Sequence, residues 1–134
     1  YLDKLSKTYG VPSNRMVLMG FSQGAMLTLH EGIYGSMDFK GLMAFSGAFF
    51  PSDTKSLHTP DVLLAHGDRD LVVPLSGTLG AEDALKAMGV KVETVISQGL
   101  GHGIDHKMIK AGQEFLQKCF TRETIENGKQ KREA

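Results

Sequence analysis

Several features are scarce in this 134-residue chain, and each absence argues against a class of protein. There is one cysteine, Cys119, so no intrachain disulfide can form, which favours a reducing compartment. No apolar run approaches the ~18 residues that a membrane span needs, and the first residues lack the layout of a signal peptide. We therefore expect a cytoplasmic protein with no stable membrane insertion.

An excess of charge of one sign is also missing. The 15 Lys and Arg residues balance the 15 Asp and Glu residues, and the formal net charge is +0. Nucleic-acid binders usually carry a basic face, so we expect no nucleic-acid partner. Hydrophobic residues make up 41% of the chain and charged residues 22%, which is ordinary globular usage and argues against disorder. The length fits one domain with a real core.

Apolar runs typical of buried strands alternate with amphipathic stretches of helical spacing along the chain. The alternation predicts an α/β fold, with a parallel sheet covered by helices on both faces. Because the last strand is half polar, we expect it nearer the sheet edge. The predicted strands are 15–20, 41–45, 61–65 and 90–96; the predicted helices are 1–9, 22–34, 76–88 and 102–120, followed by a flexible polar tail at 121–134.

The first predicted strand runs into the sequence Gly20-Phe21-Ser22-Gln23-Gly24, a G-x-S-x-G pattern. In a nucleophile elbow the serine adopts a strained backbone on a sharp strand-to-helix turn, and flanking glycines avoid clashes there. The hydroxyl of Ser22 would then project above the sheet, and the backbone amide of Gln23 could hold an oxyanion. The alternative interpretation is an ordinary glycine turn between a strand and a helix.

Polar residues follow two further predicted strands. Asp68 and Asp70 lie after the third strand, where either carboxylate could orient a histidine, or both could serve as turn or cap residues. His102 lies in a glycine-rich loop after the fourth strand; the alternative is a surface loop histidine. Because the carboxyl ends of parallel strands meet at one edge, these residues and Ser22 should lie together. Their chain order of Ser, Asp and His is that of the α/β-hydrolase triad.

Four strings, GFSQGA, FSG, HGDRDLVVP and GLGHGI, resemble the phospholipase/carboxylesterase family of α/β-hydrolases over about residues 11–120. That family includes bacterial carboxylesterases, acyl-protein thioesterases and lysophospholipases. The resemblance implies that the triad is Ser22, Asp70 and His102, with Asp68 as a turn former. It implies hydrolysis of short-to-medium acyl esters, with thioesters and lysophospholipids as further candidates, and no metal or organic cofactor. The partner would be a small ester or thioester substrate.

The sequence departs from the family in its first part. Family members carry earlier strands and an L-H-G-x-G-type loop that supplies a second oxyanion amide, and this sequence contains no such loop. The resemblance therefore implies a partial domain at 1–134 that corresponds to the C-terminal portion of the enzyme and lacks the N-terminal strands. We expect the strand at Met16–Met19 to form an exposed apolar edge.

Two of the remaining expectations, a homodimer and a non-catalytic relative, depend on this departure. Homodimers are common in the family, and an exposed edge would favour one here. The alternative function is a non-catalytic relative that binds an acyl ligand or another chain; a prolyl-oligopeptidase-type peptidase is a further alternative. Candidates for an apolar acyl pocket are Leu71, Val72 and Phe49, with Val73 and Phe50 beside them, although core packing or a turn accounts for each equally well.

Overall fold

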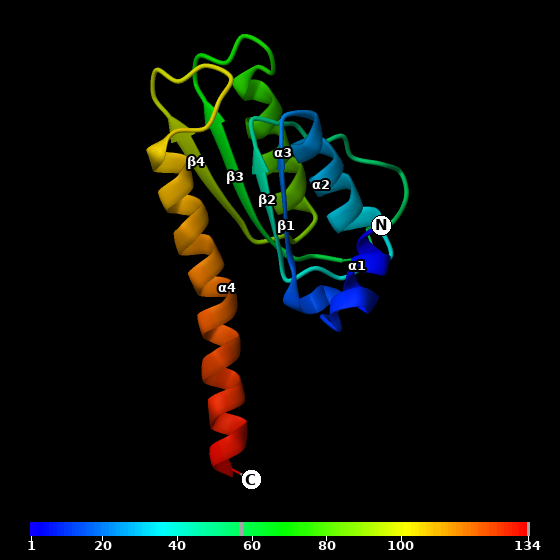
Figure 1. Ribbon diagram of the computed structural model, residues 1–134. Helices are drawn as coiled ribbons and strands as arrows, with labels where there is room; N and C mark the ends of the chain where they lie inside the picture. Colours follow the sequence, from blue (N-terminus) through cyan, green and yellow to red (C-terminus); the bar gives the residue numbers. More distant parts are fainter. Residues whose placement is uncertain (57, 134) are drawn as a thin grey trace.

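The protein forms a four-stranded parallel sheet with helices on both faces (Figure 1). The computed structural model describes residues 1–56 and 58–133, with side chains as far as Thr121. The strand order is β1-β2-β3-β4, and every neighbouring pair is parallel. In chain order the elements are α1 (Leu2–Tyr9), a 3-10 turn (Ser13–Arg15), β1 (Val17–Phe21), α2 (Gln23–Tyr34), β2 (Gly41–Phe45), β3 (Asp61–Gly67), α3 (Leu75–Ala87), β4 (Val92–Ser97) and α4 (His106–Glu133).

Alternate residues of the central strands face opposite layers. Leu42 and Ala44 of β2 pack in the cluster formed with α2 and α3, whereas Met43 and Phe45 pack in the cluster formed with α4. Because helices cover both faces, β2 and β3 are buried along nearly their whole length. This two-sided burial explains why both strands are continuous apolar runs in the sequence.

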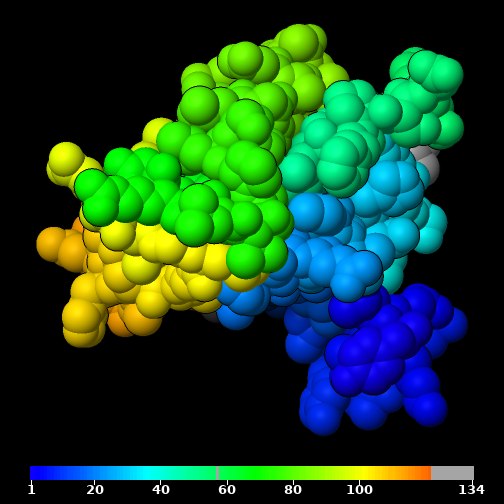
Figure 2. Space-filling view, turned by 90° about the horizontal axis from the view of Figure 1, so that it is seen from above, coloured from blue at the N-terminus to red at the C-terminus, as the bar shows by residue number. Residues whose placement is uncertain are grey.

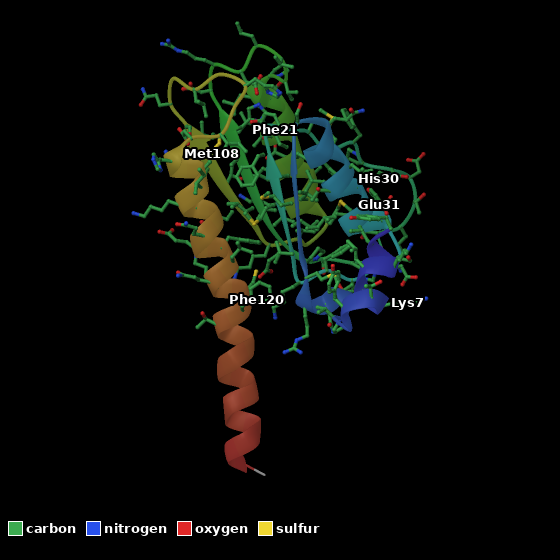
Figure 3. The ribbon with its side chains drawn as sticks, in the orientation of Figure 1. Lys7, Phe21, His30, Glu31, Met108 and Phe120 are labelled. Atoms are coloured by element: carbon green, nitrogen blue, oxygen red, sulfur yellow. The ribbon has the colours of Figure 1, made fainter. Side chains whose placement is uncertain are left out.

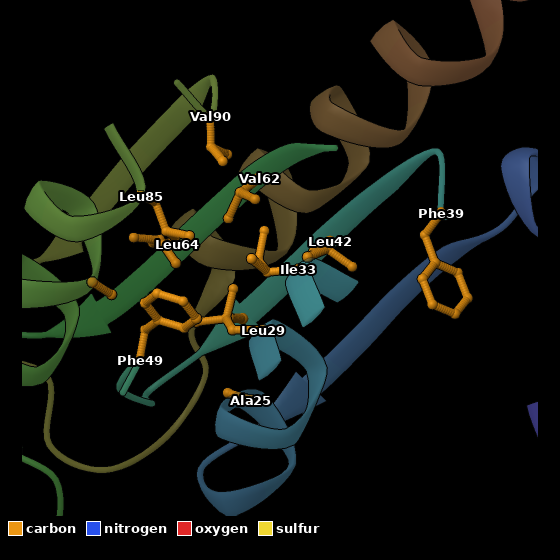
Figure 4. Packing of buried hydrophobic residues seen from close by; sticks show 12 residues of the cluster. Ala25, Leu29, Ile33, Phe39, Leu42, Phe49, Val62, Leu64, Leu85 and Val90 are labelled. Atoms are coloured by element: carbon orange, nitrogen blue, oxygen red, sulfur yellow. The ribbon is translucent and has the colours of Figure 1, made fainter. Parts of the chain in front are cut away.

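The larger core cluster fills the space between the sheet and the helices α2 and α3 (Figure 4). Leu29 and Ile33 of α2 and Leu85 of α3 are each at most 1% exposed, and they meet Val62 and Leu64 of β3. The second cluster, on the other face, receives residues at helical spacing from α4: Met108, Ala111, Phe115 and Cys119. The prediction of helices on both faces is confirmed.

The start of α4 is the largest difference from the sequence prediction, because a helix was expected over 102–120 and the helix begins at His106. Asp105 caps it. The Oδ1 atom of Asp105 accepts hydrogen bonds from the amide of Met108 and the hydroxyl of Ser97, both at 3.0 Å. The four residues that precede this cap are therefore free to form an irregular loop at the end of the sheet.

The backbone of α4 remains helical through Glu133, beyond the predicted end at residue 120. Side chains after Thr121 lie outside the described part of the chain, so the flexibility expected for 121–134 stays a prediction. The other strand and helix boundaries lie within two residues of their predicted positions.

Strand β1 forms one edge of the sheet, as expected, and β4 forms the other. Met19 is 62% exposed on β1, and a cavity of about 650 Å³ lies beside this strand between α1 and α2. An exposed apolar edge of this kind favours pairing with a further strand. Within the described residues, no helix combines the length and the apolar character that crossing a bilayer requires.

Candidate active site

The carboxyl ends of three strands bring the predicted site residues to one edge of the sheet. Ser22 follows β1, Asp70 follows β3, and His102 follows β4. In the view from above (Figure 2), the green segment around residue 70 lies against the yellow segment around residue 100, next to the blue chain that follows β1. The parallel topology thus assembles, in one place, residues that are up to 80 positions apart in the sequence.

Ser22 sits in a strained turn between β1 and α2. Its backbone has φ 58° and ψ −119°, and it is one of two non-glycine residues at positive φ in the described part of the chain. Such a conformation costs about 1–3 kcal/mol and persists only where the surroundings enforce it. The amide of Ser22 donates a hydrogen bond of 2.8 Å to the carbonyl of Phe45, which fixes the turn to the end of β2.

The two glycines of the G-x-S-x-G pattern have different steric roles. A Cβ atom at Gly20 would collide with the carbonyl of Gly24 and lie 2.6 Å from the Oγ1 atom of Thr28, so this position requires glycine. A Cβ atom at Gly24 meets nothing within 4 Å in the described part of the chain. The expectation that both glycines avoid a clash is therefore correct for Gly20 only.

Hydrogen bonds join the three predicted side chains in series. The Nδ1 atom of His102 lies 2.7 Å from the Oδ2 atom of Asp70, and its Nε2 atom lies 3.0 Å from the Oγ atom of Ser22. A carboxylate can only accept, so Nδ1 carries the proton and Nε2 is free to accept from the serine hydroxyl. In this tautomer the imidazole can act as a general base toward Ser22.

The carboxylate of Asp70 is held in a buried position. Its Oδ1 atom accepts hydrogen bonds from the amides of Val72 and Val73, both at 2.9 Å. Burial alone raises the pKa of Asp70, but the hydrogen bonds from His102, Val73 and Val72, with the coulombic attraction of the His102 ring, outweigh it and lower the pKa. Residues 70–73, hereafter the acid turn, thus present an ionised carboxylate to His102.

Asp68 has a different partner from Asp70. Its Oδ1 atom accepts a hydrogen bond of 2.7 Å from the amide of Gly99, and its own amide donates to the carbonyl of Ser97 at 3.1 Å. The first bond ties the end of β3 to residues 98–105, hereafter the histidine loop, and the second ties it to the last residue of β4. The residue pattern left the choice between the two carboxylates open and the family resemblance implied Asp70; the structure brings Asp70, not Asp68, to His102.

Three residues that the sequence analysis did not assign to the site support the histidine loop. A Cβ atom at Gly67 would collide with the carbonyl of Leu100, so glycine lets the loop cross the end of β3. Ser46 is fully buried at φ 55°, and its hydroxyl donates to the carbonyl of Gly103 at 3.2 Å. The ring of Phe21 lies with its centroid 4.9 Å from that of His102, and Figure 3 labels Phe21 at the upper end of β1.

His66, which matched no catalytic position in the sequence, is fully buried beneath the acid turn. Its Nε2 atom donates to the carbonyl of Val73 at 2.7 Å and lies 3.3 Å from the Oδ2 atom of Asp70. Its Nδ1 atom lies 2.7 Å from the hydroxyl of Thr78 in α3. The signal that could have identified it is a histidine at the end of an otherwise apolar strand, four residues before the acid.

Gln23, the predicted oxyanion residue, is the first residue of α2. The first amides of a helix have no carbonyl partner within it, and the positive end of the helix dipole favours an anion there. The Gln23 amide therefore lies where an oxyanion would form beside Ser22, and its role there stays a prediction.

The predicted acyl-pocket residues fall into two groups. Leu71 is 96% exposed and Val72 is 68% exposed, so both present apolar side chains to solvent next to Asp70. Phe49 is only 7% exposed and belongs to the larger core cluster, where its ring stacks on that of Tyr34 at 5.9 Å. Phe49 therefore packs in the core of this chain, and its predicted part in an acyl pocket stays a prediction.

Among the described residues, no group of three or more His, Cys, Asp or Glu side chains could hold a metal ion.

The sequence matches the model of the phospholipase/carboxylesterase family over residues 3–120, which extends the resemblance seen over about 11–120 toward the first helix. Acyl-protein thioesterase 1 of Neurospora crassa is 31% identical over 116 residues, which cover 80% of this chain and 47% of that protein. Esterase YpfH of Escherichia coli is 30% identical over 128 residues, covering 92% of this chain and 55% of the esterase. The chain spans about half the length of the curated relatives it matches.

Solved structures agree with the sequence comparison. The crystal structure of esterase PE8 superimposes with a TM-score of 0.84 at 35% identity, covering 88% of this chain and 56% of that one. The parallel sheet and its helices are therefore those of an α/β-hydrolase. With this fold and a family match over nearly the whole described chain, the protein belongs to the phospholipase/carboxylesterase family.

Proposed function

We propose that this chain carries the serine-hydrolase site of a carboxylic-ester hydrolase that acts on short-to-medium acyl esters. Thioesters and lysophospholipids are further candidate substrates. The observation that supports the proposal most directly is the series of hydrogen bonds from Ser22 through His102 to Asp70, at 3.0 Å and 2.7 Å. The strained backbone of Ser22, at a cost of about 1–3 kcal/mol, also supports the proposal, because such strain is typical of functional sites.

In the first half of the reaction, the Oγ atom of Ser22 attacks the carbonyl carbon of the ester while the Nε2 atom of His102 takes the hydroxyl proton. Asp70 stabilises the imidazolium and keeps the ring in its tautomer. When the tetrahedral intermediate collapses, His102 gives the proton to the leaving alcohol or thiol. The products of this half are an acyl-serine at Ser22 and the released leaving group.

In the second half, water attacks the acyl-serine and His102 takes its proton, then returns it to the Oγ atom of Ser22 as the acid departs. The amide of Gln23 donates to the oxyanion in both tetrahedral intermediates. Loss of one such donor typically costs about 10²–10³ in kcat. A single amide therefore predicts slow turnover by this chain unless a second donor faces the same oxyanion.

The exposed pair Leu71 and Val72 supports an acyl substrate with an apolar chain. Both side chains follow Asp70 directly, at 96% and 68% exposure, and a bound acyl chain would remove them from water. The named relatives, a thioesterase and an esterase, act on acyl groups with different leaving groups. We therefore assign the acyl group, not the leaving group, as the recognised part of the substrate.

Hydrolysis of p-nitrophenyl esters with acyl chains from two to eight carbons tests the proposal. We expect turnover by the wild-type chain and none above background for Ser22→Ala. Ser36→Ala is the matched control, because Ser36 is an exposed serine at the far end of α2 and makes no contact in the proposed mechanism. Equal turnover by Ser22→Ala and Ser36→Ala would refute the assignment of the nucleophile.

The alternative is a non-catalytic relative that binds an acyl ligand or a partner chain. The single predicted oxyanion amide favours it, and the hydrogen-bonded triad disfavours it. A folded wild-type chain that binds a medium-chain acid but hydrolyses none of the esters would favour the alternative.

Two further expectations belong to this proposal. Pairing of the exposed β1 edges of two copies would give a homodimer, and sedimentation velocity with and without Met19→Lys tests it. The single buried Cys119 fits a reducing compartment, so we expect the activity in the cytoplasm.

A further inference from the structure

His66 is the one fully buried histidine in the described part of the chain, and it lies directly beneath the acid turn. Its ring nitrogens have partners on two different elements. Nδ1 lies 2.7 Å from the Thr78 hydroxyl on α3, and Nε2 lies 2.7 Å from the carbonyl of Val73 in the acid turn. The side chain therefore connects the core to the turn that holds Asp70.

The directions of these hydrogen bonds follow from their chemistry. A backbone carbonyl can only accept, so the Nε2 atom of His66 carries a proton and donates it to Val73. In the neutral ring Nδ1 then accepts from the Thr78 hydroxyl. The same Nε2 atom lies 3.3 Å from the Oδ2 atom of Asp70, so its N–H also faces the oxygen that His102 uses.

Val73 transmits this contact to the acid. Its carbonyl accepts from His66 at 2.7 Å, while its own amide donates to the Oδ1 atom of Asp70 at 2.9 Å. The carbonyl and the amide of Val73 belong to two rigid peptide units that meet at its Cα atom, so fixing the carbonyl restricts the φ and ψ rotations that would move the amide away from the carboxylate. The Oδ1 atom of Asp70 thus accepts hydrogen bonds from two backbone amides, and its Oδ2 atom lies near the rings of His102 and His66.

We propose that His66 is a positioning residue for the reaction: from the core it holds the acid turn so that Asp70 meets His102 in the productive geometry. Only the expected effect on the rate of ester hydrolysis rests on the proposed function. The expected effect on the tautomer of the His102 ring can be measured without a substrate. The need for a polar residue follows from burial, since an apolar side chain would leave the Val73 carbonyl without its partner.

Three substitutions at position 66 and on α3 separate positioning from packing. In His66→Gln the amide nitrogen reaches as far as Nε2 did and can still donate to the Val73 carbonyl, whereas in His66→Asn it reaches only as far as Nδ1. Thr78→Val removes the hydroxyl partner of His66 at nearly unchanged volume. Leu64→Ala is the matched control, because Leu64 is a buried residue of the same strand and belongs to the larger core cluster.

The experiment is performed on the whole chain and has two readouts. Nitrogen-15 NMR of the histidine rings gives the tautomer of His102, and ester hydrolysis gives kcat and KM. We expect His66→Asn to lose the single Nδ1–H tautomer of His102 and to lower kcat by about 10–100-fold, with KM within about threefold. His66→Gln should keep both values close to wild type, and Thr78→Val should shift both in the direction of His66→Asn.

The outcomes decide between the two roles. Leu64→Ala should lower the melting temperature while leaving the tautomer and kcat unchanged. The inference is overturned if folded His66→Asn behaves as Leu64→Ala does, or if His66→Gln loses as much as His66→Asn. Where His66→Asn does not fold, an unaltered His102 tautomer in Thr78→Val overturns it. Absence of ester hydrolysis by the wild type would refute the proposed function, and the NMR readout would still decide the role of His66.

Discussion

Asp68 accepts a hydrogen bond of 2.7 Å from the amide of Gly99 and so joins the end of β3 to the histidine loop. Two residues later, Asp70 lies 2.7 Å from the Nδ1 atom of His102, which that loop carries. The two carboxylates therefore have different roles at this edge of the sheet: Asp68 holds the histidine loop, and Asp70 orients the His102 ring.

Replacing Asp70 by Asn should lower kcat by about 10⁴-fold, because the amide would favour the wrong tautomer of His102. Asp68→Asn should change kcat by less than about threefold, since its side-chain oxygen can still accept from Gly99. Steady-state kinetics on a short-chain ester measures both. The reverse pattern would transfer the role of the acid to Asp68.

Stability should fall at acid pH through Asp70. Its pKa is lowered in the folded chain, so the unfolded state binds the proton more readily at low pH. The contribution of Asp70 is present above its unfolded pKa of about 3.9 and is lost as the pH falls through its lower folded pKa. Urea denaturation from pH 7 to pH 3 should therefore show a steeper loss of stability for wild type than for Asp70→Asn. Equal slopes would contradict the lowered pKa.

The two glycines beside Ser22 should differ in their tolerance of alanine. Gly20→Ala places a Cβ atom against the carbonyl of Gly24, so we expect a loss of about 1–3 kcal/mol in the free energy of unfolding, or a failure to fold. Gly24→Ala meets no described atom within 4 Å and should be nearly neutral. Thermal and urea unfolding of both variants is the measurement, and equal losses would show that the nucleophile turn is not packed as described.

Leu71 provides a test of acyl recognition that leaves the fold intact. Its side chain is 96% exposed, so Leu71→Ser should not change the melting temperature. If an acyl chain covers this side chain, kcat/KM for an octanoyl ester should fall by about tenfold while the value for an acetyl ester stays within twofold. A uniform loss for both esters would mean that Leu71 acts on the acid turn and not on the acyl chain.

The cap on α4 gives a prediction about the histidine loop. Asp105 accepts from the Met108 amide and the Ser97 hydroxyl, and the Met108 hydrogen bond contributes most to lowering its pKa. Asp105→Ala should lower the melting temperature by a few degrees and allow the start of the helix to fray. Asp105→Asn, which keeps an accepting oxygen, should lose less. Hydrogen exchange at Met108 reports the fraying directly.

The residue pattern was sufficient to predict the sheet and the meeting of Ser22, His102 and one of two aspartates, and the resemblance to the family added the choice of Asp70. Strands buried on both faces, such as Gly41–Phe45, are uninterrupted apolar runs, and parallel strands must end at a common edge. The polar residues after those strands were therefore expected to meet, and Ser22, Asp70 and His102 do lie in hydrogen-bonding contact.

Other parts of the site depend on tertiary contacts that leave no local pattern. The sequence does not show a role for a buried histidine such as His66, because that role depends on its hydrogen bond to the carbonyl of Val73. The sequence could not predict that Phe49 stacks on Tyr34, because packing on a core residue and packing on a ligand both require an aromatic ring. The start of α4 at His106 could not be predicted either, because it depends on the hydrogen bond between Asp105 and Ser97, which lies eight residues earlier on β4.

The most direct test of the central claim is covalent labelling of the chain with a fluorophosphonate, followed by intact-mass measurement and peptide mapping. Such a probe reacts with a serine only where a neighbouring base and an oxyanion donor activate it. The account predicts a single adduct on Ser22, absent in Ser22→Ala and strongly slowed in His102→Ala. A folded wild-type chain that gains no adduct, or that gains one on another serine, would contradict it.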